Sequence, residues 1–316
     1  MAMTIYDISK KAGVSIATVS RVLNGSENVR PSTRKKVMDV IDKYDYTPNA
    51  FARGMGLHSL KTIGILCADS SDLFLAKAVY FLEQELQANG YESLLCCTGY
   101  NPDIKKNYLN LILSKKVDSI ILVGSHFIGF NEDENQYIKD VSTQVPIMLL
   151  NASFDHPNVY STLCDDYGTM FEAATEMIQS GITDILYLYD SKSYSGLKKL
   201  HGFCDAMKEY NIPGFEKLIH FYDGNIEHLN EVADFVARIA TKGTSFHGIM
   251  TSDDSLAIGS IKYAQKKGIR IPEELSVMGY NNSMLTNCCT PELTSVDNRL
   301  ETQTHQLVQT LLGVLA

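Results

Sequence analysis

Short apolar runs alternate with amphipathic stretches from Thr62 onward, and this alternation constrains the fold more than any other feature of the chain. The runs TIGILCA, ESLLCCT, SIILVG and PIMLLN are separated by stretches of helical spacing near residues 74–89, 102–115 and 132–141. A second series follows with ILYLYD, LIHFY, GIMTS and LSVMGY. Strands that alternate with helices form parallel sheets with right-handed crossovers, so two such series predict two α/β lobes.

The first 46 residues follow a different pattern, typical of three short helices. Gly13 suits the end of a first helix, and Ser15 suits the start of a second. A helix-turn-helix needs a small residue where its helices cross, a residue that tolerates positive φ in the turn, and an apolar residue that packs the second helix against the first. Ser9, Gly13 and Val19 occupy those places, so residues 5–24 predict this motif.

The net charge of -9 hides an asymmetry between the two ends of the chain. Residues 1–61 carry ten Lys/Arg against five Asp/Glu, whereas the remainder is acidic. A basic head attracts a phosphate backbone and an acidic body repels it, so the head is where DNA would be met.

Residues 47–61, TPNAFARGMGLHSLK, predict a short connecting helix that is marginal by itself. Gly54 and Gly56 each cost such a helix about 1 kcal/mol relative to alanine. We expect this segment to become helical only against a partner.

The block IYDISKKAGVSIATVSRVLNGSENVRPSTRKKVMDVIDKYDYTPNAFARG resembles the head and hinge of the lac repressor (LacI) family, and is most similar to its catabolite-control members. The resemblance implies that Ile16, Ala17 and Arg21 face base edges, with Thr18 and Ser20 on phosphates. Arginine offers a bidentate fork for guanine, and small apolar side chains suit thymine methyls. Ile16 could instead serve partly in packing.

The same resemblance implies that two hinge helices pair in the minor groove, where Met55 would be wedged between base steps. The alternative is that Met55 only packs on the linker. The DNA-binding residues implied in this way are Thr4, Ile16, Ala17, Thr18, Ser20, Arg21, Asn24, Asn49, Ala50, Arg53 and Met55.

The chain from Thr62 to about residue 300 is similar to the family's core of two periplasmic-binding-protein-like lobes with a ligand cleft between them. The matching pieces are DYG at 166–168, HGF at 201–203, SDDSLAIG at 252–259, GYNN at 279–282 and PELTSV at 291–296. Beyond a stretch like LLGVLA the family usually continues for another strand or two that complete the second lobe, so either that lobe is trimmed here or the chain is shortened.

Three positions of the expected cleft also depart from the family. Lys199 stands where sugar- and purine-responsive members carry an arginine, Asn281 replaces the usual acidic residue, and Asn225 falls where several members have an aromatic ring. A sugar or sugar phosphate would be held by polar side chains with Phe74 as an apolar wall; the alternative is a cleft without a physiological ligand. The expected effector-binding residues are Phe74, Asn151, Lys199, Asn225, Asp253 and Asn281.

Other classes of function lack their sequence signals. The phosphate-binding loop G-x-x-x-x-G-K-[ST], the dinucleotide motif G-x-G-x-x-G, the nucleophile elbow G-x-S-x-G and the zinc motif H-E-x-x-H do not occur, so we expect no catalytic residue and no cofactor. The seven cysteines have no zinc-ligand spacing and are predicted to be reduced and buried. No apolar run is long enough for a membrane helix, which predicts a cytoplasmic protein without a membrane partner.

The sequence therefore predicts a dimeric DNA-binding transcription regulator, most simply a repressor of sugar-metabolism genes that binds a pseudo-palindromic operator. Its expected parts are a head at 1–46, a hinge at 47–61, and an effector-binding and dimerisation core at 62–316 of the α/β class. One rival is a catabolite-control regulator that responds to a phosphorylated phosphocarrier protein. A more remote rival is a cytosolic sugar-binding protein.

Overall fold

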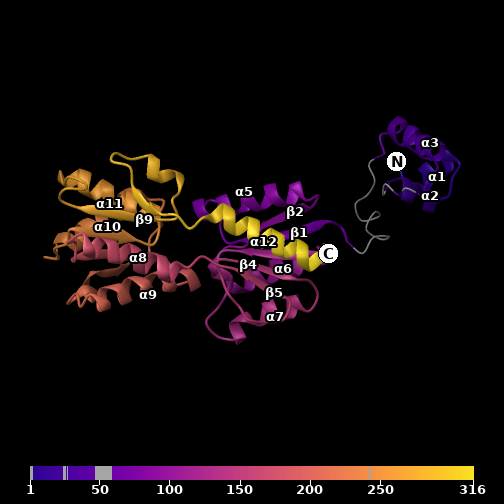
Figure 1. The fold of residues 1–316 in the computed structure, drawn as a ribbon. Coiled ribbons are helices and arrows are strands. Elements are labelled where there is room, and N and C mark those ends of the chain that lie inside the picture. Colours follow the sequence, from indigo (N-terminus) through magenta and orange to yellow (C-terminus); the bar gives the residue numbers. More distant parts are fainter. Residues whose placement is uncertain (1–2, 24–25, 27, 47–58, 242) are drawn as a thin grey trace.

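The computed structural model describes residues 3–23, 26, 28–46, 59–241 and 243–316. The N-terminal head consists of α1 (Ile5–Ala12), α2 (Ile16–Leu23) and α3 (Pro31–Lys43), as predicted (Figure 1). These helices pack around Ile8, Val19 and Val37, which are completely buried. The head therefore has a small hydrophobic core of its own.

Local hydrogen bonds set the geometry of the first two helices. The Thr4 hydroxyl accepts from the Asp7 amide while the Asp7 carboxylate accepts from the Thr4 amide, so α1 begins with a capping box. Gly13 ends α1 with a φ of 62°, a left-handed conformation in which a side chain is strained. The buried Ser9 hydroxyl donates to the Tyr6 carbonyl, which leaves its polar group satisfied.

The first lobe is a parallel sheet of strand order β2-β1-β3-β4-β5 with helices on both faces. Helices α5 and α12 pack on one face, and α6 and α7 on the other. The strands are β1 (Thr62–Cys67), β2 (Glu92–Cys97), β3 (Ser119–Val123), β4 (Ile147–Leu150) and β5 (Val159–Thr162), and the helices are α5 (Leu73–Ala88), α6 (Pro102–Ser114), α7 (Gln136–Ser142) and α12 (Leu300–Leu315).

The second lobe repeats this design with a sheet of strand order β10-β9-β8-β6-β7. Helices α8 and α9 pack on one face, and α10 and α11 on the other. The strands are β6 (Ile185–Tyr189), β7 (Ile219–Phe221), β8 (Gly248–Thr251), β9 (Ser276–Tyr280) and β10 (Thr294–Val296), and the helices are α8 (Asp166–Gln179), α9 (Tyr194–Glu209), α10 (Leu229–Thr241) and α11 (Asp254–Lys267).

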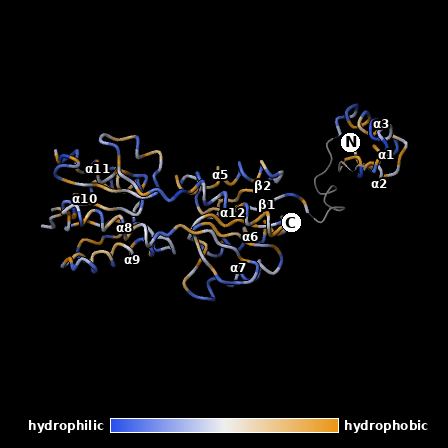
Figure 2. The backbone as a smooth tube through the Cα atoms, viewed as in Figure 1, coloured by the Kyte–Doolittle hydropathy of each residue, from blue (hydrophilic) through white to orange (hydrophobic). Residues whose placement is uncertain are grey.

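The two sheets have the same topology. When the strands of each lobe are numbered 1 to 5 along the chain, their order across the sheet is 2-1-3-4-5 in both. Strands covered on both faces need apolar residues at every position, which is why the central strands are continuous hydrophobic runs (Figure 2). The α/β class and the two lobes predicted from the sequence are confirmed.

The chain passes between the lobes twice, after β5 and after β10 (Figure 1). The second passage brings α12 back to the first lobe, where Leu307, Val308 and Leu311 are completely buried. The apolar stretch near residue 311 therefore closes the core of the first lobe.

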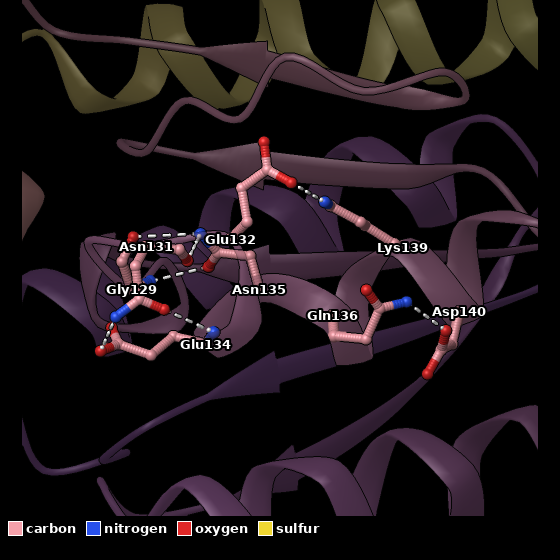
Figure 3. Close-up of polar contacts among 8 residues, drawn as sticks. All are labelled: Gly129, Asn131, Glu132, Glu134, Asn135, Gln136, Lys139 and Asp140. Atoms are coloured by element: carbon pink, nitrogen blue, oxygen red, sulfur yellow. Dashed lines mark hydrogen bonds and ion pairs between the residues drawn. The ribbon is translucent and has the colours of Figure 1, made fainter.

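The predicted helix at 132–141 begins later than expected, at Gln136. Side chains hold the preceding loop: Asn135 bonds to both backbone groups of Gly129, and Asn131 accepts from the Glu134 amide (Figure 3). The Glu134 carboxylate also accepts from the Phe130 amide. These contacts satisfy backbone groups that a longer helix would otherwise pair.

The cysteine prediction is right in one respect and wrong in another. All seven are free thiols, but Cys67 alone is fully buried among them, and Cys97 and Cys288 are exposed. Cys97 lies on β2, an edge strand that has a neighbour on one side only, so an apolar sequence context there does not bring burial.

Helices α8 and α9 approach so closely at Gly202 that a side chain has no room. A Cβ there would lie 2.2 Å from the Tyr167 carbonyl oxygen. We expect Gly202→Ala to cost about 1–3 kcal/mol through this overpacking and to lower the urea midpoint of the second lobe.

Gly313→Ala is the matched control, because a Cβ at this position of α12 meets no atom within 4 Å. It should be neutral or stabilising by up to about 1 kcal/mol, since alanine favours a helix. Equal urea midpoints for the two variants would contradict the close approach of α8 and α9.

Candidate DNA-binding head and effector cleft

Helix α2 has one buried and one open face. Val19 and Val22 pack into the head, whereas Ile16 is 38% exposed and Ala17 and Arg21 are exposed. The residues expected at base edges therefore share the open face of the helix. Their contact with bases stays a prediction.

The other expected DNA-binding residues fall into two groups. Thr18 and Ser20 are half-buried, and the Thr18 hydroxyl is hydrogen-bonded to Ser15 Oγ at 2.9 Å. Thr4 is exposed and caps α1. The remaining predicted residues, Asn24, Asn49, Ala50, Arg53 and Met55, lie outside the described residues.

The polar side chains of the core gather where strands of both sheets end. In the first lobe Ser125 follows β3 and Asn151 follows β4; in the second, Asp190 follows β6 and Asp253 follows β8. Carboxyl ends of parallel strands at the point where the strand order reverses are the usual ligand site of open α/β sheets. The lobes touch at this edge, where Ser125 Oγ donates to Ser193 Oγ at 2.8 Å.

Two adjoining cavities lie in this cleft, an inner one of about 90 Å³ and an outer one of about 730 Å³. They share Asp72, His126, Asp190 and Asp253 in their walls. The structure thus brings all six sequence-predicted effector residues to one cleft: Phe74, Asn151, Lys199, Asp253 and Asn281 line the inner cavity, and Asn225 and Asp253 line the outer one.

Asp253 and Asn281 form an oriented pair in the second lobe. Asp253 caps α11 by accepting from the Ser255 amide at 2.7 Å, and it accepts from Asn281 Nδ2 at 2.9 Å. Asn281 Oδ1 in turn accepts from Asn298 Nδ2 at 3.0 Å. These bonds fix which oxygen and nitrogen atoms the pair can offer to a ligand.

Asn151 occupies the facing wall with an unsatisfied group. Its side chain is only 7% exposed, and Oδ1 has no hydrogen-bond partner among the described residues. A buried acceptor without a donor costs roughly 1–3 kcal/mol, which a donor on a bound ligand would recover.

Lys199 is bound within the second lobe. Its ammonium donates to the Ser252 carbonyl at 3.1 Å and lies 3.8 Å from the centroid of the Tyr280 ring. The Tyr280 hydroxyl donates to Asp166 at 2.7 Å. The ammonium that stands in place of the family's arginine is therefore engaged by protein groups.

Carboxylates dominate the electrostatics of the cleft. Burial raises the pKa of Asp72 to about 6, and the charges of Asp253 and Asp190 add to that rise. Burial also raises the pKa of Asp253, again with Asp190 contributing. Carboxylates from the two lobes thus repel one another across the cleft.

His126 adds no compensating charge near neutral pH. Burial, followed by the Lys105 ammonium, lowers the pKa of His126 to about 4. Its ring lies edge-on to Tyr100, with 4.8 Å between the ring centroids. The wall of the cleft at this point is neutral and aromatic.

Sequence reasoning missed Asp72, Asp190, Tyr100 and Phe221, all of which line the cavities. A usable signal existed for two of them, because Asp190 directly follows the strand ILYLY and Asp72 follows TIGILC by a few residues. Tyr100 follows β2 in a loop and Phe221 ends β7, so their presence in one cavity depends on how the two lobes meet, which periodicity does not reveal.

Neither a metal centre nor a membrane span emerges from the part of the chain that the structure describes. No cluster of three or more His, Cys, Asp or Glu residues there could hold a metal ion. No helix among the described residues is long and apolar enough to cross a bilayer.

A helix-turn-helix head followed by a two-lobed core with a central cleft defines a class of bacterial transcription regulators. Residues 4–49 match "Bacterial regulatory proteins, lacI family", and residues 60–314 match "Periplasmic binding proteins and sugar binding domain of LacI family". The chain belongs to the LacI family, as the sequence predicted.

Three known proteins illustrate the relationship. The chain is 50% identical over 313 residues to an HTH-type transcriptional regulator of Lachnoclostridium phytofermentans, covering 99% of this chain and 93% of the relative. It is 33% identical to catabolite control protein A of Priestia megaterium, covering 94% and 87%. A lac repressor dimer bound to operator and an anti-inducer has the same fold, with a TM-score of 0.87, 20% identity, and coverage of 100% and 93%.

The exposed arginine of α2 supports a test of base recognition. We expect Arg21→Ala to cost about 1–3 kcal/mol on the preferred duplex and to relax the preference at one guanine per half-site. Lys35, exposed on α3, serves as comparison, because Lys35→Ala should weaken all sequences alike. Fluorescence anisotropy measures the affinity of both variants for a selected and for a random duplex. If Arg21→Ala lost the same affinity on the two duplexes, Arg21 would be a phosphate contact.

The raised pKa of Asp72 predicts a pH-dependent stability. Its folded-state pKa of about 6 lies above the ordinary 3.8, so ionisation opposes folding as pH rises from about 4 to about 6. Asparagine keeps the bond that caps α5, which Asp72 accepts from the Leu75 amide at 2.8 Å. Asp72→Asn should therefore raise the melting temperature above pH 7, and the gain should disappear below about pH 4.

Asp155→Asn is the control for this pH series, because Asp155 is exposed outside both cavities. Its melting temperature should follow the wild type at every pH. A gain for Asp72→Asn that does not change with pH would contradict the electrostatic origin of the effect.

Proposed function

We propose that this chain is a sequence-specific repressor whose affinity for a pseudo-palindromic operator is set by a small molecule in the interlobe cleft. Residues 1–46 would bind DNA, 47–61 would form the hinge, and 62–316 would form the sensing and dimerisation core. The observation that carries the proposal is that one chain contains both a DNA-binding head and a cleft. Helix α2 of the head has an exposed face, and Asn151 in the cleft has a buried Oδ1 without a hydrogen-bond partner among the described residues.

Dimerisation is supported by an apolar surface at the edge of the first lobe. Leu94 and Leu95 of β2 are 37% and 45% exposed, and Tyr80 of the adjacent α5 is 52% exposed. An apolar edge strand is a liability unless another surface covers it. A second copy of the chain would cover this edge and bring two heads to the two half-sites of a palindrome.

Control by a phosphorylated phosphocarrier protein is the second candidate, favoured by the 33% identity to catabolite control protein A. A phosphorylated partner calls for exposed Lys or Arg. Helix α12 contains neither, and Lys77 of α5 already lies 4.7 Å from the centroid of the Tyr80 ring. The face of the first lobe that α5 and α12 form therefore offers a phosphorylated partner little free positive charge, which favours the small molecule.

A cytoplasmic, non-enzymatic role follows from the same proposal. The relatives named above are transcription regulators, and operator DNA is reached in the cytoplasm. The cleft would then bind its ligand without transforming it.

The proposed signal is a change in the angle between the lobes. Two crossovers link the lobes, and Ser125 and Ser193 bond across the cleft, so a ligand that contacts both walls would favour one arrangement over another. A ligand shifts such an equilibrium only by its difference in affinity for the two arrangements. The hinge, with its two glycines, would transmit that shift to the spacing of the heads.

The oriented pair in the second lobe allows a direct test. Asp253→Ala and Asn281→Ala should each abolish the thermal shift produced by the effector, since each leaves a half-buried partner without its charge-assisted hydrogen bond, at a cost of about 1.5–3 kcal/mol. Both variants should still bind operator in the absence of effector. Differential scanning fluorimetry and anisotropy on the full chain measure the two properties.

Asn107→Ala supplies the control, because Asn107 is exposed on α6 outside both cavities. An effector response that survives both cleft substitutions would move the sensing site elsewhere. Failure of the wild type to prefer any sequence in a selection from random duplexes would refute the proposal as a whole.

A further inference from the structure

We propose that the cleft binds an uncharged saccharide of at least two linked rings and excludes phosphorylated sugars. The inference rests on the proposed function and specifies the chemical class of its effector. Three independent properties of the cleft support it: the sign of its charge, the balance of its hydrogen-bonding groups, and the shape and lining of its outer cavity.

The first property is a large excess of negative charge. Among the described residues that line the two cavities, Lys199 supplies the sole Lys or Arg cation, and its ammonium is held by Ser252 and Tyr280. The carboxylates in the same walls are Asp69, Asp72, Asp190, Asp223, Glu227 and Asp253. Lys199 offsets part of the charge of Asp253, but carboxylates outnumber ammonium groups in these walls, so a further phosphate group is repelled.

The second property is an excess of acceptors over donors. Asn151 lines the inner cavity, and its buried Oδ1 lacks a donor among the described groups. Carboxylates such as Asp190 and Asp253 also only accept when ionised. Every hydroxyl of a neutral saccharide can donate to these atoms, whereas the hydroxyl that carries the phosphate in a sugar phosphate is replaced by a dianion with no hydrogen to donate.

Asp190 shows the same pattern from the second lobe. It accepts from the Ser252 hydroxyl at 2.8 Å, and its charge contributes to the raised pKa of both Asp72 and Asp253. A neutral ligand that donates to this group relieves the repulsion without adding charge. Hydroxyl donors are therefore the matching chemistry.

The third property is the size of the outer cavity. It leaves room for a part of the effector beyond the group that fills the inner cavity. The inner cavity measures about 90 Å³ and the outer about 730 Å³. Tyr100 of the first lobe and Phe221 of the second, 52% and 36% exposed, both line the outer cavity. Aromatic side chains in the lining of a cavity suit the apolar face of a further sugar ring, and the Phe221 ring also has the Lys192 ammonium 4.7 Å from its centroid.

The deciding experiment compares matched pairs on the full chain. Trehalose, sucrose, maltose and cellobiose are each measured against their 6-phosphates, with glucose and glucose 6-phosphate as single rings, first by thermal shift and then by calorimetry. We expect at least one neutral disaccharide to bind about 100-fold or more tightly than its phosphate, and about tenfold or more tightly than glucose.

Two variants separate charge from stacking. Asp190→Asn retains an oxygen for the Ser252 hydroxyl but removes the charge, so it should raise the affinity ratio of phosphorylated to neutral disaccharide at least about tenfold. Phe221→Ala should reduce the preference for disaccharide over glucose. Phe130→Ala, which changes a side chain that is 70% exposed and outside both cavities, should alter neither ratio.

The inference is overturned if a sugar phosphate binds the wild type more tightly than its neutral counterpart, if glucose binds as tightly as every disaccharide, or if no neutral disaccharide binds at millimolar concentration. Operator binding is measured on the same samples by anisotropy. Absence of operator binding before any sugar is added would refute the proposed function, whereas intact operator binding with the wrong ligand preference would refute only the effector class.

Discussion

The convergence of parallel-strand carboxyl ends at one edge of each sheet is the constraint on which the rest of this structure depends. Because each strand returns through a helix, the loops that follow β3, β4, β6 and β8 all emerge at the edge facing the other lobe. Residues as distant in sequence as Asn151 and Asn281 therefore line one cavity. The two crossovers keep these edges opposed while leaving the lobes separate cores, an arrangement that allows their relative angle to change.

Carboxylates dominate the charge of the cleft. Asp72 and Asp253 face the same space with raised pKa values, and the ammonium of Lys199 is drawn away onto Tyr280 and the Ser252 carbonyl. A site built in this way stores unfavourable repulsion that a donor-rich ligand relieves. The free protein carries the cost of this repulsion in its stability.

Several elements show where periodicity is informative and where it fails. The run SIILVG predicts β3 because all five strand residues are buried between two helical layers. In contrast, β10 has only three residues, so its pattern is too short to distinguish from a loop. The late start of α7 depends on Asn135 and Glu134 bonding to a loop several residues upstream, and the exposure of Cys97 depends on which strand lies at the sheet edge.

The sequence by itself determined the helix-turn-helix, the two α/β lobes and the family, because these rest on local periodicity, caps such as Thr4 and Gly13, and a long specific block of residues. It also identified the six residues expected at the cleft, through the resemblance. Only the tertiary structure decided that Asn151 Oδ1 is left without a donor, that Lys199 is engaged by Tyr280, and that Asp72 and Asp190 oppose each other across the lobes. These properties arise from side chains on separate elements meeting in space, and no local pattern encodes the distances between them.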